Sequence, residues 1–422
     1  MNKEANGEKT NLILLSNSFP YGNWEPYLET EVAYYDCFDE VHVLALQIRK
    51  DHRGRLRQLP SDKFKVFPVF YAPKWVYLLN SVFVLFDKNL YAEIGKLHRQ
   101  HRLTVSALVR LFVFLSRAHY EARHIKKYLR KSGLLKAKER GVLYVYRFEY
   151  QPYLAVLLQR YLPDYKIIAR AHGYDLYEEV NEANYIPLRE YLLEHLEKVV
   201  LIADAGYTYL SERFPDYREK LQVSKLGTVD RGEAQTKHGI PLHLVSCSTV
   251  LPIKRLHLIA QALEKVNSEV IWTHYGDGPV MEEVKNACSS LPKNVQVDFR
   301  GMVPNQQILE DYAKEAYHLF LNVSSSEGIP VAIMEAMSFG IPCIATDVGG
   351  NGEIVTDGYS GKLLPADFDP QVLADYIDEF AGMQETEYDT MRKNAREDWS
   401  QKHSADNNYP RFVAQLFSMT EV

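Results

Sequence analysis

Short apolar runs alternate with amphipathic stretches through the first half of the chain. The runs predict strands at Asn11–Ser16, Val41–Leu46, Val142–Tyr146, Lys166–Ala171 and Lys198–Ala203. Helical patterns lie between them, for example at Glu29–Phe38 and Pro187–Glu197. Continuous apolar runs are typical of strands buried on both faces, and their alternation with helices predicts an α/β domain with a parallel sheet.

The same alternation starts again after Gly227. Further strands are predicted at Leu242–Ser246, Val270–His274, Val295–Phe299, Leu319–Val323 and Cys343–Thr346. Helices are predicted between them at Lys254–Val266, Pro279–Ser289 and Ile308–Ala316, and a fourth helix is predicted to end near Phe339. A chain of 422 residues also exceeds the size of one ordinary core. We therefore expect two domains, 1–227 and 228–403, with a closing helix in 404–422 that completes the first.

A helical, aromatic and basic segment, residues 74–140, interrupts the first series. Between Lys96 and Arg140 it carries thirteen Lys and Arg against two acids, Glu121 and Glu139, although the whole chain has a net charge of −6. Such a block favours an anionic partner. The segment contains no nucleic-acid motif and the remainder is acidic, so we expect an anionic membrane surface as the partner of 96–140 and no nucleic acid. A packed helix pair with a solvated basic face is the alternative.

Composition narrows the class of protein. The hydrophobic fraction of 46% and charged fraction of 25% exclude a mainly disordered or collagen-like chain. Four cysteines without CxxC spacing argue against a disulfide framework. Neither a leader-like apolar run near Met1 nor an apolar stretch of membrane-spanning length is visible in the sequence. We expect a cytoplasmic protein, attached peripherally to the inner face of the cell membrane.

The segment from Asn322 to Leu364 carries the most specific chemistry. Pro330 suits the first turn of a helix, and Gly340 suits its C-terminal cap. The backbone amides near Gly328 would then lie at a helix N-terminus, where an anion is stabilised. Glu327 stands just before this helix, and Glu335 lies inside it among apolar neighbours.

This segment resembles the donor-site signature of glycosyltransferase family 4. The resemblance rests on Glu327 and Glu335, seven residues apart, and on the pattern formed by Gly328, Pro330, Ala336, Gly340 and Pro342. It implies a retaining enzyme of the GT-B fold, with two Rossmann-like domains facing an interdomain cleft, similar to bacterial exopolysaccharide and colanic-acid glycosyltransferases. It also implies that Glu327 holds hydroxyls of the donor sugar and that Glu335 holds the ribose. The residues that would face the diphosphate or sugar are Gly328, Ile329, Pro330 and Val331.

Two further segments agree with this resemblance. Lys254 lies at the start of a predicted helix, where a cation next to a helix terminus forms an anion site. In the family a lysine here contacts the donor phosphates. The arginine that the family commonly has five residues earlier is Thr249, so Arg255 is a candidate to replace it. Gly276 and Gly278, after a strand, resemble a glycine pair that lines the nucleotide pocket.

The N-terminal half offers additional candidates. His172 ends a predicted strand on the face where open α/β sheets bind ligands, and it resembles a family histidine near the donor sugar. For Asp175, with Glu178, we expect a helix capping box. Gly22 would permit close approach of the backbone to the donor phosphates. Glu25, Glu29 and Glu31 resemble an acidic pattern that contacts the acceptor, although exposed helix charges are the simpler interpretation.

We expect no cofactor and no essential metal. Asp367 and Asp369 form a DxD triplet, a metal-binding motif in other glycosyltransferases, but they precede a helical pattern and suit helix capping.

Together these features predict a glycosyltransferase with Lys254, Glu327 and His172 as catalytic residues. The donor would be a nucleoside-diphosphate sugar, with UDP and GDP not distinguished, and the acceptor a glycan carried on polyprenyl diphosphate. Two alternatives stay open. A non-hydrolysing nucleotide-sugar epimerase would convert the donor without an acceptor, and a catalytically silent scaffold for polysaccharide assembly would release no nucleotide.

Overall fold

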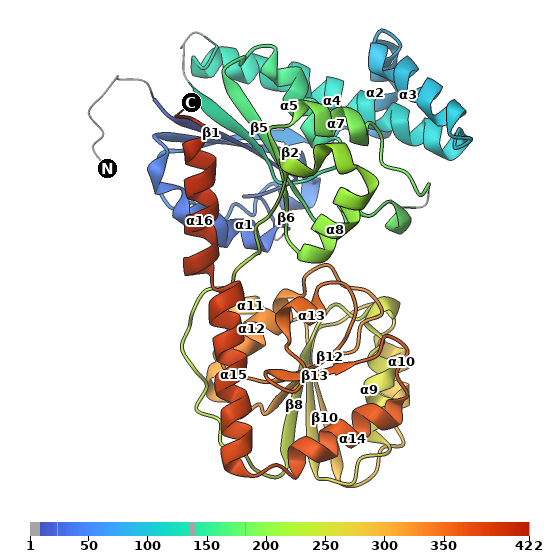
Figure 1. Cartoon of the computed structure of the whole chain (residues 1–422), viewed down its shortest axis with the longest axis vertical. Coiled ribbons are helices and arrows are strands. Elements are labelled where there is room, and N and C mark those ends of the chain that lie inside the picture. Colours follow the sequence, from blue (N-terminus) through green and yellow to red (C-terminus); the bar gives the residue numbers. More distant parts are fainter. Residues whose placement is uncertain (1–8, 23, 136–139, 182, 422) are drawn as a thin grey trace. The chain divides into compact units, whose positions relative to one another are not determined.

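The computed structural model describes residues 9–22, 24–135, 140–181 and 183–421. The chain divides into two compact units (Figure 1): unit 1 comprises Met1–Ser224 and Tyr409–Val422, and unit 2 comprises Lys225–Asn408. These divisions fall a few residues from the predicted boundaries at 227 and 403. Three members of the basic segment, Lys136, Lys138 and Glu139, lie outside the described residues.

Unit 1 is built on a seven-stranded parallel sheet in the order β3-β2-β1-β4-β5-β6-β7. Its strands are β1 (Asn11–Ser16), β2 (Glu40–Ile48), β3 (Phe64–Phe70), β4 (Gly141–Val145), β5 (Tyr165–Ala171), β6 (Lys198–Leu201) and β7 (Leu221–Val223). Side chains of β1 alternate between two cores: Ile13 and Leu15 join one hydrophobic cluster, and Leu12 and Leu14 join another. The sheet is therefore buried on both faces, as its apolar runs predict.

Helices cover the two faces of this sheet. On one face lie α4 (Val105–Ser132) and α5 (Gln151–Gln159), whose apolar residues share the cluster of Ile13. On the other face, α16 (Ala405–Ser418) contributes Phe412, Val413 and Leu416 to the cluster of Leu12. The remaining helices of unit 1 are α1 (Pro26–Glu31), α2 (Lys74–Val84), α3 (Lys88–Arg99), α6 (Gly173–Leu176), α7 (Arg189–His195) and α8 (Asp204–Arg213).

Unit 2 contains a six-stranded parallel sheet in the order β10-β9-β8-β11-β12-β13. Its strands are β8 (Leu242–Cys247), β9 (Val270–Tyr275), β10 (Val295–Gly301), β11 (Leu319–Asn322), β12 (Cys343–Thr346) and β13 (Gly361–Leu364). Its helices are α9 (Leu256–Leu263), α10 (Met281–Ala287), α11 (Asn305–Lys314), α12 (Val331–Ser338), α13 (Asn351–Ile354), α14 (Pro370–Ala381) and α15 (Glu385–His403). The predicted pair of parallel α/β domains is confirmed.

In both sheets the strand order reverses direction next to the first strand of the unit. The reversal lies between β1 and β4 in unit 1 and between β8 and β11 in unit 2. The loops that follow two such strands diverge to opposite faces and leave a crevice at their carboxyl ends, where open α/β sheets bind ligands. We therefore expect functional side chains at these two positions.

Candidate active site

In unit 2, the strands on either side of the reversal each supply one charged side chain. Lys254 ends the short 3₁₀ helix Pro252–Lys254 that follows β8, and Glu327 lies in the loop that follows β11. The Lys254 Nζ lies 2.6 Å from the Glu327 Oε1. The two side chains are 22% and 10% exposed, so this ion pair is largely shielded from water. Two residues that are 73 positions apart in sequence thus meet at the reversal.

Glu327 is held firmly by its neighbours. Besides Lys254, the Ser324 hydroxyl donates to its Oε1 at 2.7 Å and the Asn322 amide at 3.3 Å. All three donors bond to the same carboxylate oxygen. This arrangement fixes the carboxylate, as a group that positions a ligand requires.

Helix α12 begins directly after this loop. Pro330 is its N-cap residue rather than a member of its first turn, and Val331 is its first helical residue. Gly328 and Ile329 form the turn between Glu327 and the helix. Gly340, with φ of 75°, follows the helix in the left-handed conformation expected of a C-terminal glycine. The Glu327 carboxylate and the amino end of α12 therefore lie on the same loop.

The loop that follows β12 forms hydrogen bonds with this turn and packs closely against it. The Gly350 amide donates to the Gly328 carbonyl at 2.9 Å, and the Thr346 hydroxyl donates to the Ser324 carbonyl at 2.6 Å. A Cβ on Gly349 would lie 1.9 Å from the Glu327 carbonyl oxygen, and one on Gly350 would lie 2.5 Å from that of Gly328. Gly349 and Gly350 are not among the predicted site residues, although a Gly-Gly pair shortly after a strand is a signal that the sequence shows.

Glu335 lies one turn inside α12 and has an unusual protonation equilibrium. Burial raises the pKa of its carboxyl to about 7, against smaller lowering effects from the Asn305 amide and Arg231. The Asn305 Nδ2 donates to the Glu335 Oε1 at 3.0 Å. A carboxyl whose pKa is raised this far by desolvation is typical of a functional position.

Arg255 does not resemble a free phosphate ligand. Its guanidinium donates to the carbonyls of Val323 at 2.8 Å, Ser324 at 3.0 Å and Ala366 at 2.8 Å. These bonds tie the loop after β11 to that after β13. The predicted contact of Arg255 with the donor stays untested, but the structure gives this side chain a scaffolding role.

Gly276 and Gly278 permit close contact between two neighbouring loops. A Cβ on Gly276 would lie 1.9 Å from the Ser248 carbonyl oxygen, and one on Gly278 would lie 2.3 Å from that of Val250. The loops after β8 and β9 are also joined by hydrogen bonds from Ser248 N to Tyr275 O and from Val250 N to Asp277 O, both 3.0 Å. The glycine pair therefore shapes the loop that carries Lys254, and its contact with a nucleotide stays a prediction.

In unit 1, His172 follows β5 as the N-cap residue of α6. The His172 backbone amide donates to the Asp175 Oδ1 at 2.5 Å. Asp175 therefore belongs to a capping box with His172, as the third residue of the helix, whereas the sequence predicted a box with Glu178. Burial and the nearby Arg147 lower the pKa of His172 and so favour its neutral form. Its role in holding the donor sugar stays a prediction.

The acidic residues near the first strand have structural roles that sequence analysis did not foresee. The buried Glu25 accepts hydrogen bonds from the amides of Asn17, Ser18 and Phe19 at 2.9 to 3.0 Å. The buried Glu31 accepts one from the Tyr35 hydroxyl and pairs with Arg170 at 3.3 Å. Glu25 and Glu31 are therefore not exposed helix charges, and their contact with an acceptor stays a prediction.

Glu29 and Gly22 occupy the same region. Glu29 is exposed and pairs with Arg57 at 3.1 Å. Gly22, with φ of 66°, packs against the His52 ring, which a Cβ would approach to 2.7 Å. The close approach that Gly22 permits in this structure is thus to His52, and its contact with donor phosphates stays a prediction.

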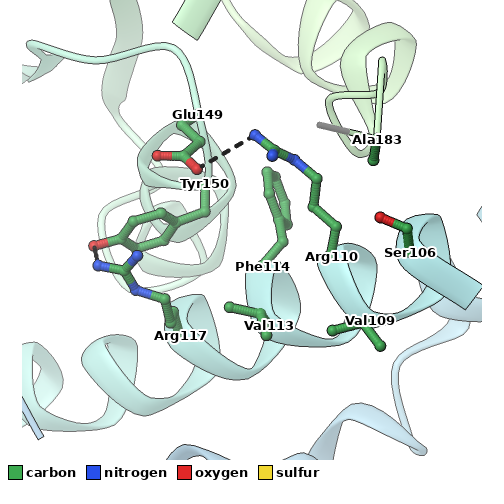
Figure 2. Close-up of a pocket in the computed structure, with 9 residues that line it drawn as sticks. All are labelled: Ser106, Val109, Arg110, Val113, Phe114, Arg117, Glu149, Tyr150 and Ala183. Carbon is green, nitrogen blue, oxygen red and sulfur yellow. Dashed lines mark hydrogen bonds and ion pairs between the residues drawn. The ribbon is translucent and has the colours of Figure 1, made fainter. Parts of the chain in front are cut away.

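Two cavities lie at the carboxyl ends of the strands of unit 1. The first cavity, of about 390 Å³, is lined by Ser106, Val109, Arg110, Val113, Phe114, Arg117, Glu149, Tyr150 and Ala183 (Figure 2). The second cavity, of about 650 Å³, is lined by Asn17, Ser18, Trp24, Gln47, Arg49, Lys50, His52, Tyr71, Ala72, Pro73 and Arg117. Arg117 lines both cavities. They flank the reversal between β1 and β4, because Asn17 follows β1 and Glu149 follows β4.

The structure also bears on the DxD triplet. The Asp369 carboxylate accepts a hydrogen bond from the Gln371 amide at 2.8 Å and caps α14, as expected. Within the described residues, no group of three or more His, Cys, Asp or Glu side chains could hold a metal ion. The absence of an essential metal stays a prediction.

Among the residues that the structure describes, three cations of the basic segment form ion pairs within unit 1. Lys96 pairs with Glu190 at 2.7 Å, Arg102 with Glu178 at 2.8 Å and Arg110 with Glu149 at 3.8 Å. The same segment, residues 74–140, also exposes large apolar residues: Trp75, Leu79, Val82, Phe83, Leu85, Phe86, Tyr91, Val105, Val109 and Val113. In the part of the chain that the structure describes, no helix is long and apolar enough to cross a membrane.

Comparison with known proteins identifies the family of unit 2. Residues 232–398, which contain Lys254, Glu327 and Glu335, match the family model described as glycosyl transferases group 1. This part of the chain is therefore similar to that family. The predicted resemblance is confirmed for the domain that carries the candidate site.

Glycosyltransferases also appear among the curated proteins that match a larger part of the chain. A putative colanic acid biosynthesis glycosyltransferase of Salmonella typhimurium is 27% identical over 61% of this chain and 64% of its own length. The GtfA subunit of a UDP-N-acetylglucosamine–peptide N-acetylglucosaminyltransferase of Streptococcus gordonii is 22% identical over 78% of this chain and 66% of its own length. The matches thus span slightly less than two thirds of each relative.

Solved structures support the fold over nearly the whole chain. The Anabaena protein HepE, solved in complex with UDP-glucose, matches with a TM-score of 0.64 over 97% of this chain and 99% of its own, at 16% identity. A sucrose-phosphate synthase of Thermosynechococcus elongatus matches with a TM-score of 0.68 over 97% of this chain and 100% of its own, at 14% identity. These likenesses confirm the predicted GT-B fold.

Proposed function

We propose that this protein is a retaining glycosyltransferase that transfers a sugar from a nucleoside-diphosphate sugar to a glycan in surface-polysaccharide synthesis. The observation that carries the proposal is the shielded Lys254–Glu327 ion pair at the strand reversal of a group 1 domain, beside the amino end of α12. A cation and a helix N-terminus together suit a diphosphate, and a fixed carboxylate suits sugar hydroxyls.

Lys254 is the residue that neutralises the diphosphate. An ammonium group has three donors, so Lys254 can stay paired with Glu327 while it donates to a phosphate oxygen. Charge develops on the departing diphosphate in the transition state, and a cation held in place before the reaction lowers the barrier. Lys254 therefore acts on the leaving group.

Glu327 holds the sugar and does not attack it. Its Oε1 accepts three hydrogen bonds, which leaves Oε2 for a sugar hydroxyl. The acceptor oxygen forms a bond to the anomeric carbon from the side of the leaving group, while the bond from that carbon to the phosphate oxygen breaks. The acceptor proton passes to the departing phosphate. This route retains the configuration of the sugar and uses no metal.

Glu335 binds the ribose in this scheme. It lies one turn inside α12, on the helix whose amino end faces the diphosphate, and its ionised form can accept two hydroxyl groups. A uridine base is supported by the UDP-glucose complex of HepE and by the UDP-N-acetylglucosamine named for the GtfA relative.

The acceptor in this proposal is a glycan linked to polyprenyl diphosphate, used at the inner face of the cell membrane. The colanic-acid relative supports a surface polysaccharide as the product. Residues 96–140 would supply basic groups to an anionic membrane surface, and the exposed apolar side chains of α2 would enter its headgroup region.

A nucleotide screen tests the donor site. Purified protein is heated with UDP, GDP, ADP and their common sugars, and we expect one nucleotide family to raise the melting temperature. Lys254→Ala should weaken binding of that nucleotide about 10-fold or more, since a charge-assisted hydrogen bond contributes about 1.5–3 kcal/mol. The exposed Lys265→Ala is the matched control and should bind normally.

The reaction itself is followed by proton NMR of the anomeric signal with an acceptor glycan present. Retention of configuration is the expected result, and inversion would contradict the proposed route. Conversion of the donor without any acceptor would favour the epimerase. A folded protein that no nucleotide stabilises would favour the scaffold.

A further inference from the structure

The first cavity of unit 1 contains two arginines with incomplete hydrogen bonding. Arg110 donates to the Asn181 side chain and lies 3.8 Å from the Glu149 carboxylate. Arg117 donates to the Tyr150 hydroxyl at 3.3 Å and lies over its ring at 4.3 Å. Figure 2 shows both guanidinium groups on the side of α4 that faces Glu149 and Tyr150.

Each of these arginines has a buried donor left over. The Nε of Arg110 and the Nε of Arg117 are buried, and neither has a hydrogen-bond acceptor among the described residues. Because both Nε atoms are covered, the terminal nitrogens of the two guanidinium groups are the ones that can donate to a ligand, and two guanidinium groups at one cavity favour a ligand rich in acceptor oxygens. The planar guanidinium matches the geometry of phosphate oxygens. A phosphate or diphosphate ester fits these requirements.

An apolar strip leads away from the same cavity. Val109 and Val113 line it, yet they are 57% and 47% exposed, and Val105, one turn earlier on α4, is 80% exposed. The spacing of four residues places these three valines, the valine strip, on one face of the helix. A small soluble phosphate would leave the strip uncovered, whereas a hydrocarbon chain attached to the phosphate would cover it.

The second cavity offers different chemistry. Its walls include Trp24, which is 42% exposed and has the Arg49 guanidinium over its ring at 4.7 Å, and the amide side chains of Asn17 and Gln47. None of the described residues that line this cavity is acidic. Gln47 donates to Asn17 at 3.1 Å and to the Tyr150 hydroxyl at 3.0 Å. A flat aromatic side chain with fixed amides suits a polar, ring-shaped ligand such as a sugar. Because Arg117 lines both cavities, a sugar in the second lies next to a phosphate in the first.

We propose that the two cavities bind a lipid-linked sugar acceptor in three parts. The diphosphate lies in the first cavity on Arg110 and Arg117, the hydrocarbon chain follows the valine strip, and the first sugar occupies the second cavity. This inference rests on the proposed function and specifies how its acceptor is recognised. It assigns to α4 the recognition of the lipid and its phosphate, separate from the donor site in unit 2.

Calorimetric titration with geranyl diphosphate tests this arrangement. The full-length protein is used with saturating nucleotide, because the nucleotide blocks the donor site from binding the probe. Arg110→Gln should weaken binding of geranyl diphosphate about 10-fold or more, as expected for loss of a charge-assisted contact. Arg102→Gln is the matched control, since Arg102 is ion-paired on the same segment but lines neither cavity.

A second comparison distinguishes a lipid from a free phosphate. Val109→Ser should weaken geranyl diphosphate about fivefold and leave inorganic diphosphate unchanged, because only the former has a chain to lie on the strip. Ile240→Ser, at an exposed position in unit 2, is the control. Nucleotide stabilisation of each variant shows that it is folded.

Three results would overturn the proposal. The first is wild-type protein that does not bind geranyl diphosphate, and the second is Arg110→Gln protein that binds it as tightly as wild type. The third is equal affinity for geranyl and inorganic diphosphate together with a silent Val109→Ser, which would indicate a soluble phosphate ligand. Failure of the glycosyltransferase proposal is recognised separately, by the absence of any nucleotide effect on wild-type protein.

Discussion

Glu335 gives the candidate site a titratable group near neutral pH. Burial raises the pKa of this carboxyl to about 7, whereas an exposed glutamate titrates near 4.3. If the ionised form accepts ribose hydroxyls, donor affinity should fall as pH decreases from 8 to 6. In Glu335→Gln this dependence should disappear, with weaker binding at pH 8. Titrations with the donor nucleotide at several pH values measure it, and an unchanged pH profile in the variant would contradict the assignment.

The same pKa predicts how stability depends on pH. The folded state holds the proton more tightly than the unfolded state, so the contribution of Glu335 to stability is fully present below about pH 4.3 and is lost as pH rises toward 7. Glu335→Gln should therefore stabilise the protein at pH 8 by roughly 1–3 kcal/mol relative to wild type, and by much less at pH 5. Urea denaturation at the two pH values checks the difference. Equal effects at both would refute the raised pKa.

At the residue scale, sequence motifs predict which side chains lie at the site more reliably than they predict what each side chain contacts. Lys254 and Glu327 were placed by a motif, and the structure brings them together. Glu25 and Arg255 show the limit of such prediction. The Glu25 carboxylate accepts hydrogen bonds from three backbone amides, and the Arg255 guanidinium donates to three backbone carbonyls. These contacts are recognisable only once the chain is folded. Backbone partners leave no mark in the sequence.

At the scale of elements, the turn before α12 depends on the loop after β12. We expect Gly350→Ala to displace this turn, because the added Cβ would lie 2.5 Å from the Gly328 carbonyl and 2.3 Å from the Ile329 Cδ1. Donor affinity should fall about 10-fold, with a loss of stability of about 1–3 kcal/mol typical of overpacking. Gly239→Ala, where a Cβ meets nothing within 4 Å, is the control. Normal donor binding by Gly350→Ala would show that the turn does not need this support.

The strands that the sequence pattern did not predict all lie at the edge of a sheet. β3, β7 and β13 are all edge strands of their sheets. An edge strand is buried less completely and tolerates interruptions, as Pro68 within β3 illustrates, so it lacks the continuous apolar run of a central strand.

The helix predicted at Glu29–Phe38 also differs from the structure, where a short α-helix is followed by the 3₁₀ helix Val32–Cys37. The central strands were predictable because burial on both faces dictates their composition.

For the whole molecule, the exposed apolar surface of α2 predicts how membrane attachment responds to salt. Exposed apolar side chains bind a membrane independently of ionic strength, and three cations of the basic segment are already ion-paired, so we expect binding to anionic vesicles to persist in part at high salt, unlike a purely electrostatic contact. Leu79→Ser in α2 together with Phe86→Ser in the turn directly after α2, whose native side chains are 65% and 85% exposed, should reduce vesicle binding at least about 10-fold. Met302→Ser, at an exposed position in unit 2, is the control. Vesicle flotation measures the effect, and full binding by the double variant would exclude α2 as the attachment surface.

The division of unit 1 between both ends of the chain has a consequence for its synthesis. Phe412, Val413 and Leu416 of α16 cover one apolar face of the sheet formed by β1 and its neighbours. A ribosome makes all of Lys225–Asn408 before it supplies these residues. During translation the nascent chain therefore carries an uncovered apolar face while the later unit is already free to fold. The part of the protein that is made first becomes complete last, and until then it depends on protection from aggregation.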